Sequence, residues 1–208
     1  MARILKVQHL ERHVRVELDN GEKLLIPHSV AGMYRLEAGR ETGPEEYLQL
    51  KEESSLHTCW NKSLGYLAIR ARSAREIEMY LSRKAFSGDV IHKTMDRLSE
   101  AGLIDDFDFA VRYIKAKMKR KAMGKNLLIR ELNAKGISRE TLRRAIHEAG
   151  ADVVDIERVY ETALAKYHSL EGKKNRFSRL SFFLAQRGFD GETVKRVLER
   201  IRKDEGGD

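Results

Sequence analysis

Twelve lysines and arginines lie between residues 111 and 150, a stretch that contains only three acidic residues. This stretch therefore has a net charge of +9, although the whole chain of 208 residues, with 40 basic and 32 acidic side chains, reaches only +8. The net charge is −2 over residues 1–60, zero over 61–110 and +1 over 151–208. Positive charge concentrated in this way attracts polyanions or an acidic protein surface.

The spacing of these residues places them on helix faces. In a predicted helix over 107–121, Arg112, Lys115 and Lys119 are separated by three and four residues and share a face. An apolar stripe occupies another face, and it consists of Phe107, Ala110 or Val111, Ile114 and Met118. Arg139, Arg143 and His147 share a face of a later helix. The candidate binding residues are all basic and lie outside the apolar stripes: Arg112, Lys115, Lys117, Lys119, Arg120, Lys121, Lys125, Arg130, Arg139, Arg143 and Arg144.

Two interpretations of this basic set stay open. Three acidic residues cannot neutralise it through internal ion pairs, which favours a surface that binds a polyanion or an acidic protein; the simpler interpretation is a solvated helix face. No regular aromatic residues are interspersed, so stacking on the bases of a single strand is not favoured.

The motifs of common enzyme classes are missing from the sequence. There is no Gly-x-x-x-x-Gly-Lys-Ser/Thr loop for nucleotide phosphates, no Gly-x-Ser-x-Gly and no His-Glu-x-x-His. The seven histidines are scattered, and the one cysteine, Cys59, cannot form an internal disulfide. We therefore expect no catalytic residues, no metal site and no cofactor, in a soluble cytoplasmic protein without a membrane span.

The first 58 residues are expected to contain a β-hairpin and helices. Asn20-Gly21 is a strong turn signal between strands predicted at about 12–18 and 22–27. Ser29 is the expected N-cap of a short helix that ends near Leu36. Residues 39–44 are expected to form a loop, and Pro44 opens another helix.

From about residue 61 the sequence predicts helices and contains an internal repeat. Ser87, Ser138 and Asp190 are equivalent expected N-caps, 51 and 52 residues apart. Apolar or basic residues match at six further offsets from these caps: Ile77, Leu128 and Leu180; Leu81, Leu132 and Leu184; Lys84, Lys135 and Arg187; Phe86, Ile137 and Phe189; Ile91, Leu142 and Val194; Met95, Ile146 and Leu198. Gly136 and Gly188 stand where a preceding helix commonly ends in left-handed geometry, and Ala85 occupies that position in the first copy.

Each copy also has an earlier predicted helix, at 62–71, 107–121 and 153–170. The expected fold is mainly α, with three tandem three-helix, helix-turn-helix-like repeats in an elongated array after a small N-terminal region that contains the hairpin. The expected domains are the N-terminal region at 1–58 and three-helix repeats at 59–104, 105–150 and 151–208.

Three motifs make the chain resemble a known family, the regulatory protein RecX, over about residues 60–200. They are Arg70-x-Arg72-Ser73-x-x-Glu76-Ile77-x-x-Tyr80-Leu81, then Gly102-Leu103-Ile104-Asp105-Asp106-x-x-Phe109-Ala110, and Ile129-Arg130-Glu131-Leu132 followed by Lys135-Gly136-Ile137-Ser138. One departure concerns the middle helix of the second repeat. The family often has Gly-Pro at its start, where this chain has Gly124-Lys125-Asn126.

The resemblance implies a regulator of the bacterial recombinase RecA. Such a protein binds RecA and its filament on DNA and mostly inhibits strand exchange and ATP hydrolysis, which affects recombination, DNA repair and the SOS response. We accordingly expect a monomer whose partners are RecA and the RecA–DNA filament, with weak non-specific affinity for DNA.

Two other functions stay open from the sequence. Arg139, Arg143 and Arg144 begin a third helix, where a helix-turn-helix transcription regulator would carry its recognition helix. The repeats would also suit an adaptor for some other acidic partner.

Overall fold

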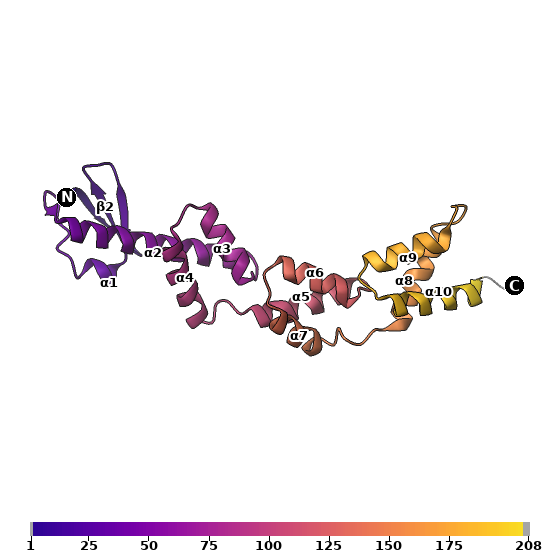
Figure 1. The fold of residues 1–208 in the computed structure, drawn as a ribbon. Helices are drawn as coiled ribbons and strands as arrows, with labels where there is room; N and C mark the ends of the chain where they lie inside the picture. Colours follow the sequence, from indigo (N-terminus) through magenta and orange to yellow (C-terminus); the bar gives the residue numbers. More distant parts are fainter. Residues whose placement is uncertain (1, 206–208) are drawn as a thin grey trace. The chain divides into compact units, whose positions relative to one another are not determined.

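The computed structural model describes residues 2–205, which form two compact units divided in the sequence between Ile104 and Asp105. The first unit combines a small sheet with four helices (Figure 1). Its elements are β1 (Ala2–His9), β2 (Val14–Leu18), β3 (Lys23–Ile26), α1 (His28–Ala31), β4 (Glu41–Thr42), α2 (Pro44–Ile69), α3 (Ala74–Arg83) and α4 (Gly88–Glu100). The second unit is helical throughout its described part and consists of α5 (Asp106–Arg120), α6 (Lys125–Ala134), α7 (Arg139–Glu148), α8 (Ile156–His168), α9 (Arg176–Gln186) and α10 (Gly191–Glu205).

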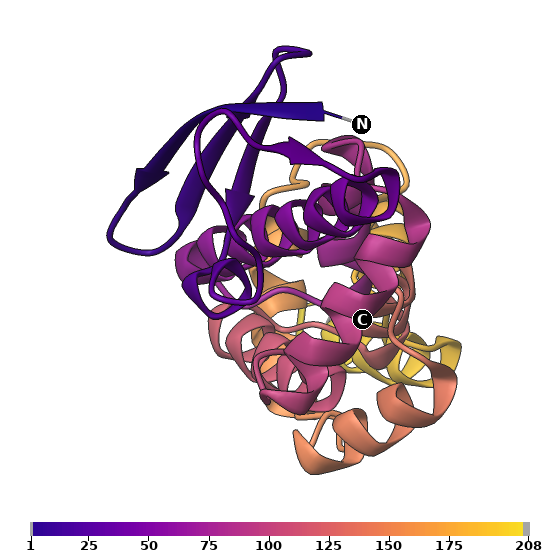
Figure 2. The same cartoon turned by 90° about the vertical axis from the view of Figure 1, so that its left-hand side faces the viewer.

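The predicted hairpin is confirmed as the β2–β3 pair. Gly21 takes a φ of +81°, a value that glycine adopts without steric cost, and its N–H donates to the carbonyl of Leu18 over 3.0 Å. The sheet has the order β3-β2-β1-β4 with antiparallel neighbours. Figure 2 shows the strands against one side of α2, which buries Leu50 among them. The Ser54 hydroxyl of α2 accepts from the N–H of Leu25, 2.8 Å away, and so occupies a donor on the edge strand.

Two local expectations in this region are wrong. Residues 41 and 42 are not part of a loop but form β4, because Thr42 pairs with Ala2 and donates its hydroxyl to the Ala2 carbonyl over 3.0 Å. Ser29 is not an N-cap. The N-cap is Pro27, two residues earlier, since its carbonyl already accepts from the N–H groups of Val30 and Ala31, and the short helix runs from His28 only to Ala31.

Helix α2 unites two helices that the sequence separates. Its 26 residues run from Pro44 through the segment expected to begin near residue 62, because no glycine or proline interrupts residues 45–61. One half packs on the sheet, and the other half contributes Cys59 to a second core with α3 and α4. The helix also crosses the expected junction between 58 and 59, so the N-terminal region and the first repeat share it. The division of the chain into four domains stays a prediction.

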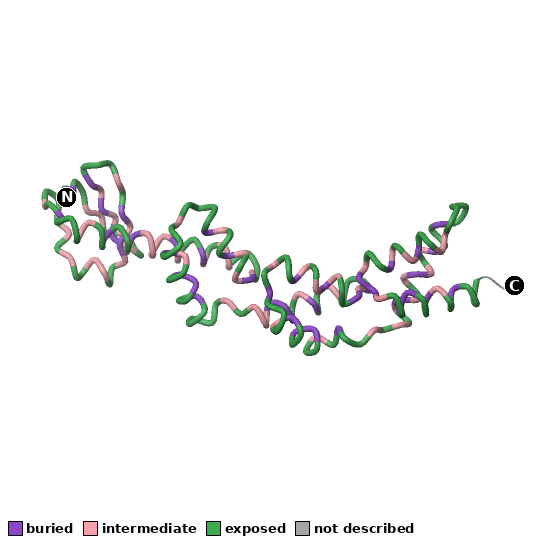
Figure 3. The backbone as a smooth tube through the Cα atoms, viewed as in Figure 1, coloured by how far each residue is buried: buried purple, intermediate pink, exposed green. Residues whose placement is uncertain are grey.

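The three-helix repeats are confirmed, and the same two positions are buried in the core of each. The first consists of the C-terminal half of α2 with α3 and α4, the second of α5–α7 and the third of α8–α10. Both positions lie before the N-cap of the third helix. The residues ten positions before it, Ile77, Leu128 and Leu180, and those six positions before it, Leu81, Leu132 and Leu184, are all fully buried. Figure 3 shows short buried stretches alternating with exposed ones along the helices of each repeat.

The turn before each third helix is built as the repeat predicts. The side chains of Ser87, Ser138 and Asp190 accept from a first-turn N–H at 3.4, 3.2 and 2.8 Å. Ala85 takes a φ of +60°, which matches the +83° of Gly136 and the +85° of Gly188. The first repeat thus forces an alanine into the left-handed conformation that the other two give to glycine.

In the second unit, backbone hydrogen bonds join the second and third repeats. The N–H of Gly124 donates to the Arg187 carbonyl over 2.9 Å, and that of Asn126 donates to the Gly188 carbonyl over 3.2 Å. The start of α6 is therefore held by the turn between α9 and α10. No helix in the described part of the chain is long and apolar enough to cross a bilayer.

Candidate partner-binding surface

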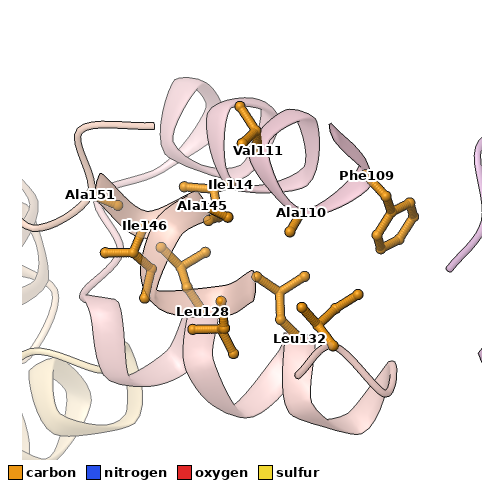
Figure 4. Packing of buried hydrophobic residues seen from close by; sticks show 11 residues of the cluster. Phe109, Ala110, Val111, Ile114, Leu128, Leu132, Ala145, Ile146 and Ala151 are labelled. Atoms are coloured by element: carbon orange, nitrogen blue, oxygen red, sulfur yellow. The ribbon is translucent and has the colours of Figure 1, made fainter. Parts of the chain in front are cut away.

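Helix α5 is the first helix of the second repeat, which contains the predicted basic residues. A capping side chain holds its start, and its apolar stripe packs into the core. The Asp105 carboxylate accepts from the N–H groups of Phe107 and Asp108 at 2.8 and 3.0 Å, which caps the helix. Figure 4 shows Phe109, Ala110 and Ile114 directed into the core of the repeat, facing α6 and α7. The sequence placed Phe107 in this stripe, but Phe107 is only partly buried, and the neighbouring Phe109 is the buried ring.

The sequence-predicted basic residues are nearly all exposed. Lys117 is the exception, with a half-buried side chain, and the other ten lie on the surface of α5, α6, α7 or the connection between α5 and α6. The fold therefore does not incur the cost of removing these charged groups from water, and their ammonium and guanidinium groups can contact an anion.

Four of the eleven already have a partner within the second compact unit. Arg112 pairs with Asp108 one turn earlier at 2.9 Å, a surface interaction worth well under about 1 kcal/mol. The Arg144 guanidinium lies 4.8 Å from the centroid of the Phe107 ring. Arg130 donates to the Gln186 carbonyl of α9 over 3.3 Å, so it helps to join two repeats.

Lys117 belongs to a small polar network. Its ammonium lies 2.9 Å from the Glu131 carboxylate, which also accepts from the Tyr113 hydroxyl at 2.6 Å. Burial raises the pKa of Glu131, but the hydrogen bonds from Tyr113 and Lys117 outweigh burial and hold that pKa below its usual value. The hydrogen bond to Glu131 in turn raises the pKa of Lys117. Lys117 thus fastens α5 to α6 and is a weak candidate for contact with a partner.

The remaining seven have no carboxylate within ion-pair distance among residues 2–205, and this is the free cationic set: Lys115, Lys119, Arg120, Lys121, Lys125, Arg139 and Arg143. All seven side chains are exposed to solvent. Lys125 is near enough to Asp190 that its charge, after the hydrogen bonds from Thr193, contributes to the lowered pKa of that carboxyl group. Such a set raises the local concentration of anions and speeds their approach, and salt screens the effect.

The structure gathers part of this set around one groove. Lys125 of α6 and Arg139 and Arg143 of α7 border a groove of about 850 Å³, which Arg144 also lines. Lys121 lies with Lys125 beside a neighbouring hollow next to the start of α8. Lys115, Lys119 and Arg120 are on α5 and line neither of these.

Sequence reasoning missed the apolar floor of this groove. Ile129, Leu142 and Ile146 line it together with the cations. The spacing of Leu142 and Ile146 marks them as core residues, which they are, but the sequence does not show that their outer edge borders an open groove. The signal that was available is an arginine directly after two of these apolar residues, Arg130 after Ile129 and Arg143 after Leu142.

The described residues offer no site for a metal. No group of three or more histidine, cysteine or acidic side chains gathers there in a way that could hold an ion. Cys59 is buried, and burial raises the pKa of its thiol, which keeps it in the unreactive protonated form at neutral pH.

Comparisons with known proteins point to one family. The models of the first and second three-helix domains of RecX match residues 59–98 and 105–146. The curated "Regulatory protein RecX" of Prosthecochloris aestuarii is 31% identical over 150 residues, which cover 72% of this chain and 97% of the relative. The protein of the same name from Chlorobium phaeobacteroides is 37% identical over 136 residues, 65% of this chain and 87% of that one, and the one from Bacillus subtilis is 26% identical over 193 residues, 92% and 73%.

Solved structures share the fold. A crystal structure of regulatory protein RecX superposes with a TM-score of 0.74 at 20% identity and covers 96% of this chain and all of the other. The RecX structure from Lactobacillus salivarius gives a TM-score of 0.62 at 21% identity, with 71% and 96% covered.

Proposed function

Because the chain belongs to the RecX family of regulatory proteins, we propose that it binds the recombinase RecA on its DNA filament and inhibits strand exchange and ATP hydrolysis. The observation that carries the proposal is the second repeat, whose free cationic set forms no ion pair with any carboxylate among residues 2–205. A filament of protein and DNA presents phosphates and acidic side chains, the groups to which such a set is complementary.

Inhibition then needs no chemistry on this chain. A regulator that occupies the filament surface prevents a second DNA strand or a further RecA subunit from reaching it. The ATPase belongs to RecA, and the regulator's own sequence has no phosphate-binding loop. The proposed acting unit is one chain, and its place of action is the cytoplasm, where RecA and DNA meet.

The free cationic set is proposed to provide the first contact. Exposed charges at the rim of an interface mainly accelerate association, and salt weakens their effect. Lys117 and Arg130, which have internal partners, are proposed to shape the repeat instead.

Titration into RecA filaments tests this function. The rate of DNA-dependent ATP hydrolysis by RecA and the yield of strand exchange should both fall as the protein is added, and both should level off at saturation. Unchanged turnover and unchanged strand exchange at saturating protein would reject the proposal.

DNA binding without RecA tests the alternative of a transcription regulator. Weak affinity that is independent of sequence and falls steeply with salt is expected, since phosphate contacts dominate it. Tight, sequence-selective binding by the protein alone would favour the alternative instead.

A further inference from the structure

The groove between α6 and α7 combines an apolar floor with a cationic rim. Its volume of about 850 Å³ lies within the second repeat, and its lining comes from both helices and from the loop after α7. We propose that this groove binds an acidic amphipathic helix of the partner protein, an inference that rests on the proposed function and specifies how the partner is held.

The floor has the spacing that an amphipathic helix needs. On α7, Leu142 and Ile146 are four residues apart and so lie one turn above the other. On α6, Ile129 faces them and is only half-buried, which leaves part of its side chain in contact with water. Figure 4 shows Ile146 beside Leu128 in the core of the repeat. Covering the floor would remove apolar surface from water at about 25 cal/mol per Å².

The rim fixes the charge of the occupant. Arg139 and Arg143 lie beside the floor on α7, and Lys125 lines the groove from the start of α6. None of the three has a carboxylate within ion-pair distance in the described part of the chain. Asp152 is the one described acidic residue in the lining, and its carboxylate is engaged by His147 Nδ1, 3.1 Å away.

The dimensions suit about two turns of helix. The floor and its rim on α7 extend over the nine residues from Arg139 to His147, which span about 12 Å of helix axis. An occupant with apolar residues at i, i+3 or i+4 and i+7, flanked by aspartate or glutamate, would place its apolar side on the floor and its carboxylates against the rim.

The floor also distinguishes a peptide from nucleic acid. Phosphates and sugars would cover Ile129, Leu142 and Ile146 without making apolar contacts to them, and the described lining contains no phenylalanine, tyrosine or tryptophan on which a base could stack. An acidic helix uses both parts of the groove, whereas a nucleic acid strand uses only the rim.

Three variants separate the floor from the rim. Ile129→Ser removes half-buried apolar surface from the floor. Asn133→Leu, at an exposed position that lines the same groove, enlarges the floor and should leave the fold intact. The double variant Arg139→Glu with Arg143→Glu reverses the charge of the rim on α7. Thermal unfolding of each full chain shows whether the repeat is folded. If Ile129→Ser does not fold, Asn133→Leu still tests the floor, because it adds apolar surface at an exposed position.

The probes are intact RecA filaments, overlapping synthetic peptides of about 20 residues that cover RecA, and a naked single-stranded oligonucleotide. We expect a peptide of acidic amphipathic pattern to bind. Ile129→Ser should weaken peptide and filament binding about tenfold, Asn133→Leu should strengthen both severalfold, and neither should alter oligonucleotide binding. The rim variant should weaken all three.

The inference is overturned if no acidic amphipathic peptide binds, or if both floor variants bind filaments and peptides as the unaltered chain does. It is also overturned if the oligonucleotide is the one probe whose affinity changes. In each of these cases the unaltered chain still inhibits RecA, so the proposed function stands. If the unaltered chain does not bind filaments at all, both proposals fail together.

Discussion

The backbones of Gly124 and Gly188 are in direct contact across the junction of the second and third repeats. A Cβ atom on Gly124 would lie 2.2 Å from the carbonyl carbon and oxygen of Gly188, and one on Gly188 would lie 2.2 Å from the backbone nitrogen of Leu127. Real Cβ atoms do not approach backbone so closely. The hydrogen bond from the Gly124 N–H to the Arg187 carbonyl depends on the same approach.

Substitution of Gly124 by alanine should therefore open this junction. We expect Gly124→Ala to lower the free energy of unfolding of the second unit by about 3 kcal/mol, because backbone must move on both sides. Urea denaturation followed by circular dichroism measures the loss. Gly191→Ala is the matched control, since nothing lies within 4 Å of a Cβ there. Equal stability of Gly124→Ala and the control would contradict the contact.

The opposite substitution, alanine to glycine, is expected not to destabilise the protein at Ala85. Its φ of +60° is costly for alanine, and glycine would remove that cost while making the unfolded chain more flexible. Ala85→Gly should therefore be neutral or stabilise by up to about 1 kcal/mol, whereas Gly136→Ala, at the equivalent turn of the second repeat, should destabilise by about 1 kcal/mol. Thermal unfolding measures both. A clear loss of stability in Ala85→Gly would mean that the first repeat is aligned wrongly with the others.

The start of α6 gives a third prediction. Lys125 is the first residue of the helix, and Gly124 before it has a ψ of 154°, which a following proline accepts. Lys125→Pro should leave stability unchanged or raise it slightly. Asn126→Pro should destabilise by about 1 to 2 kcal/mol, because it removes the N–H that donates to the Gly188 carbonyl. Chemical denaturation compares the two variants, and equal effects would show that this hydrogen bond contributes nothing.

Stability of the first unit should depend on pH through Glu22. Hydrogen bonds from Lys51 and Tyr47 lower the pKa of Glu22 to about 2, from an ordinary value of 4.5. A lowered pKa in the folded state stabilises the fold above about pH 4.5, and this contribution disappears as the pH falls toward 2. A third of the side chain is exposed, so the contribution is at most about 1 kcal/mol.

Glu22→Gln should accordingly reduce stability at pH 7 and flatten its dependence on pH between 4.5 and 2. Denaturant midpoints at a series of pH values give the curve. Glu11→Gln is the control, at an exposed residue with no ion pair in the described structure. Parallel curves for Glu22→Gln and the unaltered chain would show that the contact with Lys51 does not contribute.

Local signals predicted much of the helical part. A capping side chain followed by apolar residues at helical spacing needs only neighbouring residues, and Ser138 with Leu142 and Ile146 illustrates why the third helices were placed correctly. The left-handed turn at Ala85 was also predicted, because two glycines at equivalent positions revealed the geometry that it must adopt.

What the sequence could not predict depends on residues far apart in the chain. The β4 strand exists because Thr42 pairs with Ala2, forty residues away, and its two residues carry no strand pattern of their own. Helix α2 is continuous because two separate cores use one helix. At the candidate site, Arg130 proved to be bonded to Gln186, a partner in another repeat that its spacing does not reveal.

The central claim is that the free cationic set of the second repeat holds the RecA filament. Its most direct test is the affinity for RecA filaments of the variant Lys115→Glu, Lys119→Glu and Arg143→Glu, compared with the control Lys62→Glu, Arg75→Glu and Lys173→Glu. Both variants change the charge equally at exposed residues. We expect both to fold, the first to lose affinity and inhibition at least about tenfold at low salt, and the control to match the unaltered chain. Full affinity and inhibition in the first variant would contradict the claim.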